Sequence, residues 1–190
     1  TNESGFFSFP KRNGKLRFSV QGARSDVNSC PEVQVNWLKA LSDLADGSKC
    51  GSTDRVFQTD ISGEGEGIQI KLTEKVVSNA ELDVYNHVNE VVDYSISYLD
   101  NPWFYESLPA FVNIERIKSK FIVPLFTRPA ACNAFWNGES INFFERGSVE
   151  ARKGTRVECA NTGQISDIIY HEWAHGLDAS LHRGDIPDPA

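Results

Sequence analysis

Two stretches of the chain carry apolar residues at helical spacing. Over residues 79–99 the apolar positions fall on one face and predict a long amphipathic helix, with Asn79 as its N-cap and Asn101-Pro102 after its end. A second helix is expected to start near Thr162-Gly163, with Asp167 early in it, where the helix dipole favours a carboxylate. Its apolar stripe consists of Ile165, Ile168, Ile169, Trp173 and Leu177.

The remaining segments are short and predict strands and turns. Before residue 79 we expect a hairpin around Arg12-Asn13-Gly14, a short helix over 33–45 and a strand over 68–72. Further on, strands are expected over 110–117 and 121–126, and a strand pair over 133–144 that turns at Asn137-Gly138. The charged stretch 145–158 is typical of a surface loop. The pattern predicts an α+β fold, with a strand-rich region at 1–79 and a region at 80–190 that carries both long helices.

Composition and charge narrow the class of protein. A content of 40% hydrophobic and 24% charged residues is typical of a soluble globular domain. The net charge of −7 argues against nucleic acid or an anionic membrane as the main partner. No apolar run reaches 18 residues, so we expect no segment that spans a bilayer.

The four cysteines favour an oxidising compartment. They permit three disulfide connectivities, and free buried thiols are the alternative to all three. Pairing of neighbours along the chain, Cys30 with Cys50 and Cys132 with Cys159, is the simplest connectivity. If the bonds form, the protein is secreted or otherwise extracellular.

The second predicted helix carries candidate chemistry, because His171-Glu172-Trp173-Ala174-His175 is an HExxH sequence. Histidines four residues apart project from one face of a helix and can bind one Zn²⁺ together. Glu172 points to the neighbouring sector, where it serves as a general base toward the water that the metal activates. The alternative is that His171 and His175 are ordinary residues of a packed helix.

A second motif gives this helix a context. Asn133-Ala134-Phe135-Trp136-Asn137-Gly138 precedes the HExxH helix by the interval found in thermolysin and its relatives, and residues 80–180 resemble that thermolysin/fungalysin group of zinc metallopeptidases, the gluzincins. The resemblance implies a thermolysin-like (zincin) catalytic half. It also implies an edge strand along the cleft, on which Asn133 binds the substrate backbone through its side chain and Ala134 through its main chain. For Asp167 it suggests a Ca²⁺-binding carboxylate, with a helix-terminus role as the alternative.

The third zinc ligand is not evident in the chain. His182 would lie about 10.5 Å along the helix axis from His175, too far to share a metal. The spacing of metzincin sites would place their third histidine at Leu181. His87 falls on the first long helix, where a structural or surface role is favoured. Thermolysin-like enzymes take this ligand from a glutamate on a later helix, so we expect it from a second polypeptide cut from the same precursor, or from a missing segment.

The sequence therefore predicts a secreted zinc-dependent endopeptidase that acts on protein or peptide substrates. This chain would supply two zinc ligands, His171 and His175, and the general base Glu172. The alternatives are a catalytically inactive secreted binding module derived from a peptidase, and an accidental motif in a disulfide-linked structural domain.

Overall fold

The computed structural model describes residues 14–18, 20–35, 57–61, 77–119, 128–129, 131–150 and 154–182. These residues include two α-helices, α1 (Asn79–Ile96) and α2 (Ser166–His182), and two 3₁₀ helices, η1 (Pro102–Tyr105) and η2 (Thr162–Gln164). The strands are β1 (Gly14–Phe18), β2 (Ser25–Ser29), β3 (Glu32–Val35), β4 (Phe57–Ile61), β5 (Leu108–Ile114), β6 (Arg116–Ser119), β7 (Arg128–Pro129), β8 (Ala134–Trp136), β9 (Ile141–Phe144), β10 (Gly147–Glu150) and β11 (Arg156–Cys159). The predicted α+β class is confirmed at this level.

A four-stranded mixed sheet organises this part of the chain. Its order is β2-β5-β9-β8, with β2, β5 and β9 parallel and β8 antiparallel at one edge. The predicted strand pair over 133–144 is confirmed by β8 and β9, which join through Asn137-Gly138, where Gly138 has a φ of 100°. Because β2 pairs with β5, the sheet combines strands from both regions of the chain.

The other described strands form smaller, separate sheets. The strands β3, β6 and β7 form a mixed sheet in that order, while β1 with β4 and β10 with β11 form antiparallel pairs.

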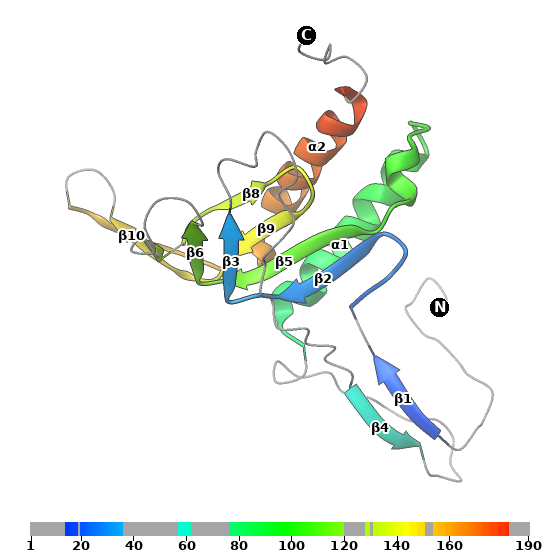
Figure 1. Ribbon diagram of the computed structural model, residues 1–190, viewed down its shortest axis with the longest axis horizontal. Helices are drawn as coiled ribbons and strands as arrows, with labels where there is room; N and C mark the ends of the chain where they lie inside the picture. The colour runs from blue at the N-terminus through cyan, green and yellow to red at the C-terminus, as the bar shows by residue number, and fades with distance from the viewer. Residues whose placement is uncertain are drawn as a thin grey trace.

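Both helices lie on the same side of the four-stranded sheet (Figure 1). Helix α1 contacts β2 and β5, helix α2 contacts β8 and β9, and the two helices contact each other. The main core between them contains apolar side chains from the sheet and from both helices, among them Val27, Val84, Val88, Ala110, Val112, Ile141, Phe143, Ile169 and Trp173. A smaller cluster of Cys30, Ile114 and Phe144 forms a second core. Among the described residues, neither helix is long and apolar enough to cross a membrane.

The first helix begins one residue earlier than its pattern indicates. Its N-cap is Ser78 rather than Asn79, because the Ser78 hydroxyl accepts from the amide of Glu81 and the Glu81 carboxylate accepts from the amide of Ser78. This reciprocal capping box satisfies two amides that the helix leaves free. The helix then ends at Ile96, before the predicted end at residue 99.

Two other predictions are wrong in places. The segment 145–158 is not an irregular loop, since β10 and β11 pair across it with Gly147 opposite Cys159. The charged residues of both strands are exposed, so the sequence shows no alternation of apolar and polar positions that would indicate strands. Residues 33–35, expected to begin a helix, belong to β3 and pair with β6. Pairing to a strand far along the chain overrode the local three-residue spacing.

Several expected segments lie outside the described residues. They are 5–13 of the first hairpin, 36–45 of the short helix, and the strands over 68–72 and 121–126.

Candidate metal centre

Helix α2 brings His171 and His175 together on its exposed face. Their Nε2 atoms lie 3.1 Å apart, and the rings meet edge to face, with centroids 4.6 Å apart and an interplanar angle of 85°. Ile169 and Trp173 anchor the opposite face of the helix in the core, so the two imidazoles are held outward. The predicted convergence of these two side chains is present in the structure.

This pair fits the donor geometry of zinc. Two nitrogens bound at about 2.05 Å to a tetrahedral ion lie about 3.3 Å apart, within a few tenths of an ångström of the observed separation. Imidazole nitrogen is also a preferred zinc donor. Among the residues that the structure describes, no group of three or more histidine, cysteine, aspartate or glutamate side chains is arranged to hold a metal ion. The described residues therefore offer two converging imidazole donors.

Glu172 lies on the neighbouring sector of α2 and is only 6% exposed. A carboxylate on this sector is displaced from the two imidazoles by about a quarter turn of the helix. This position suits a proton acceptor beside the two histidines.

The other histidines have separate surroundings. Nδ1 of His87 lies 2.8 Å from the Tyr170 hydroxyl, which donates to Glu90 Oε2 at 3.0 Å. His87 thus links α1 to α2, in keeping with the structural role favoured for it. Burial raises the pKa of the Tyr170 phenol, and the hydrogen-bonded carboxylate of Glu90 and the charge of Asp167 raise it further. Nδ1 of His182 lies 2.8 Å from the backbone carbonyl of Asp178 and 3.3 Å from the Asp178 carboxylate.

The edge strand begins beside the start of α2. Asn133 is exposed, and Ala134 is half-buried as the first residue of β8. Among the described strands, β8 pairs with β9 alone. The buried Thr162 hydroxyl, in η2 just before α2, lies 2.9 Å from the Asn133 carbonyl and 2.8 Å from the Phe144 amide. It therefore connects Asn133, the residue before β8, and β9 to the segment that leads into α2.

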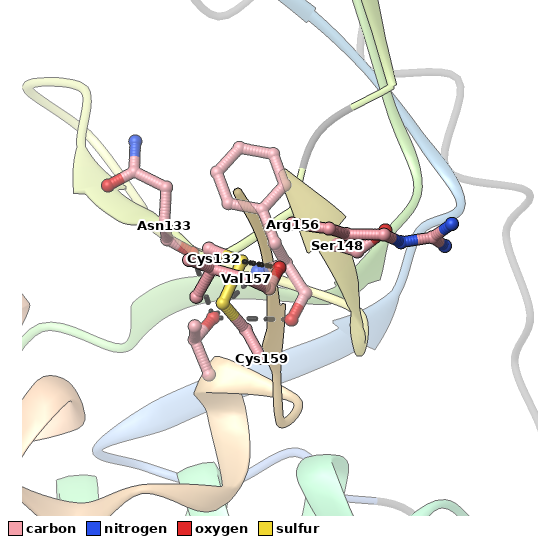
Figure 2. Close-up of a disulfide and its surroundings, with 8 residues drawn as sticks. Cys132, Asn133, Ser148, Arg156, Val157 and Cys159 are labelled. Carbon is pink, nitrogen blue, oxygen red and sulfur yellow. Dashed lines mark hydrogen bonds between the residues drawn. A yellow bond between two sulfur atoms is a disulfide. The ribbon is translucent and has the colours of Figure 1, made fainter. Parts of the chain in front are cut away.

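A disulfide reinforces the same junction. Cys132 and Cys159 are bonded, with Cα atoms 5.2 Å apart, which confirms the predicted pairing (Figure 2). The Asn133 side chain extends away from the disulfide in this view. Cys132 has a φ of 60°, a left-handed conformation uncommon outside glycine, in a segment fixed by the disulfide. Cys30 is also disulfide-bonded, whereas Cys50 lies outside the described residues, so its predicted pairing with Cys30 stays a prediction.

Sequence reasoning missed Thr162 and the partners of Tyr170. A threonine just before a helix looks like an ordinary cap, and no local pattern indicates that it spans two strands. Asp167 lies exposed in the first turn of α2, as expected for a helix-terminus carboxylate.

Comparison with protein-family models, with curated proteins and with solved structures finds no match.

Proposed function

We propose that this chain is the zinc-binding half of a secreted, thermolysin-like endopeptidase of the gluzincin type. One observation carries the proposal: two imidazole Nε2 atoms converge to 3.1 Å on the exposed face of α2, next to the buried Glu172. The spacing thus places two imidazole donors and a buried carboxylate on adjoining sectors of one helix.

The surrounding architecture supports the proposal. An antiparallel edge strand with the sequence Ala134-Phe135-Trp136 lies over the helix that carries His171 and His175. A strand with a free edge can accept an extended peptide as an added strand, held by main-chain hydrogen bonds. In this proposal Asn133 and Ala134 bind the substrate backbone.

Each candidate site residue has a defined role. His171 and His175 would hold a zinc ion through Nε2, and the ion would supply Lewis-acid chemistry. Glu172 accepts a proton from the attacking water and returns it to the departing amine. A catalytic zinc has three protein ligands, and the described residues of this chain bring two together, so in this proposal a second polypeptide contributes the third. The Cys132–Cys159 disulfide supports the extracellular location.

The test is hydrolysis of a fluorogenic peptide by the assembled protein. Activity is expected to disappear on removal of zinc by a chelator and to return when zinc is restored. Glu172→Gln keeps the shape of the side chain but removes the base, so hydrolysis should fall about 10²–10⁴-fold while zinc stays bound. Glu158→Gln, which changes an exposed carboxylate on β11, is the matched control and should retain activity. Normal hydrolysis by Glu172→Gln would refute the assigned role.

A further inference from the structure

Gly176, one residue after His175, lies where α2 comes closest to a cluster of tryptophans. A Cβ atom built on Gly176 would lie 2.8 Å from Cζ2 and 2.9 Å from Cη2 of Trp103, and 3.4 Å from Cζ3 of Trp136. The first two distances are shorter than packed carbon atoms allow. Glycine inside a helix is otherwise unfavourable relative to alanine, so close packing supplies the reason for it here.

The tryptophans join the helix to the edge strand. Trp136 is the last residue of β8, and its ring meets that of Trp103 edge to face at 6.4 Å. The Trp103 ring lies 5.6 Å from Trp173 of α2, and Trp173 stacks on Phe104 at 6.0 Å. Trp103 therefore lies between α2 and the end of β8, in contact with both.

Hydrogen bonds also hold the backbone of Trp103 in place. It lies in the first turn of η1, where its amide donates to the Asn101 side chain, and Asn101 in turn donates to Ser180 of α2. The opposite end of β8 is held through the Thr162 hydroxyl. Because the Trp103 ring meets both Gly176 and Trp136, extra volume at residue 176 would widen the spacing between α2 and the end of β8.

We propose that the missing side chain at Gly176 sets the distance between the catalytic helix and the edge strand, and that Gly176 and Trp103 are positioning residues for peptide hydrolysis. The inference rests on the proposed function, because it assumes that substrate binds along β8 while His171, Glu172 and His175 act from α2. Reacting groups displaced by about 1 Å can lose a factor of about 10² in rate.

The experiment is a double-mutant cycle on the assembled, zinc-loaded protein. Gly176→Ala introduces the Cβ, and Trp103→Phe removes the ring atoms that it would meet. In the wild-type background Gly176→Ala should lower kcat per bound zinc about 10- to 100-fold, with little change in KM, because substrate still binds along β8. In the Trp103→Phe background the same change should cost less than about threefold.

The melting temperature gives a readout that needs no activity. Gly176→Ala should lower Tm by roughly 2–10 °C in the wild-type background and by less in Trp103→Phe, since overpacking is relieved. A raised Tm, as helix propensity alone demands, or an equal kcat loss in both backgrounds would overturn the inference. A fully active Gly176→Ala protein would overturn it and leave the proposed function standing. A wild-type protein that lacks peptidase activity would instead refute the proposed function, while coupled Tm values would still report the contact between Gly176 and Trp103.

Discussion

The Thr162 hydroxyl is the contact whose loss can be worked out most directly. This side chain is 3% exposed, and its oxygen lies 2.8 Å from the Phe144 amide, 2.9 Å from the Asn133 carbonyl and 3.2 Å from the Phe144 carbonyl. Replacement by valine keeps the shape and removes these hydrogen bonds. A buried backbone group left without a partner costs about 1–3 kcal/mol.

Part of that loss is recovered within the sheet. The Phe144 amide also lies 3.4 Å from the Asn133 carbonyl, a long contact that can tighten once the hydroxyl is gone. We therefore expect Thr162→Val to lose about 2 kcal/mol of unfolding free energy, or about 4–8 °C in Tm for a chain of this length. Thr162→Ser keeps the hydroxyl and loses one methyl group, which costs about 0.8 kcal/mol.

Urea unfolding followed by tryptophan fluorescence measures both variants against the wild type. The valine variant should be the less stable of the two. The slope of its unfolding free energy against urea concentration should equal that of the wild type. If Thr162→Val is as stable as Thr162→Ser, the hydroxyl does not hold the junction between β8 and α2, and the reasoning fails.

Two further predictions concern covalent structure and assembly. Non-reducing peptide mapping should recover Cys132 joined to Cys159 and Cys30 joined to Cys50, whereas alkylation of four thiols in the native protein would contradict the disulfides and the extracellular location together. This chain alone, shown pure by mass spectrometry, should bind zinc weakly and cleave no casein, because its described residues bring together two imidazoles and a catalytic zinc needs three protein ligands. Tight zinc binding with casein digestion by the isolated chain would place the third ligand within residues 1–190.

The helices were predictable because their apolar residues repeat along one face. Val84, Val88 and Val92 occupy the buried side of α1, and Ile169 and Trp173 that of α2, as the helical spacing indicates. The placement of His171 and His175 on one exposed face follows from the same geometry and needed no knowledge of the sheet. The start of α1 was misplaced by one residue because Ser78 and Asn79 are both suitable caps, and only the reciprocal Ser78–Glu81 bonds decide between them.

The sheet was less predictable because its order depends on long-range pairing. The parallel pairing of β2 with β5 joins residues some eighty positions apart, and no local pattern specifies it. The pairing of β10 with β11 was not predictable from the apolar pattern, because both strands expose charged residues. Two contacts around the candidate site also join distant segments, Thr162 with Asn133 and Gly176 with Trp103. The sequence therefore predicts the candidate ligands and base on α2 but not the contacts that position them.

Zinc content tests whether His171 and His175 bind a metal. Elemental analysis of the assembled protein after exhaustive dialysis should give about one Zn²⁺ per copy of this chain. His175→Ala removes one of the two converging Nε2 donors and should reduce the zinc content to near zero. His182→Ala, the matched control seven residues further along α2, should leave the zinc content unchanged. Full retention of zinc by His175→Ala would contradict the account.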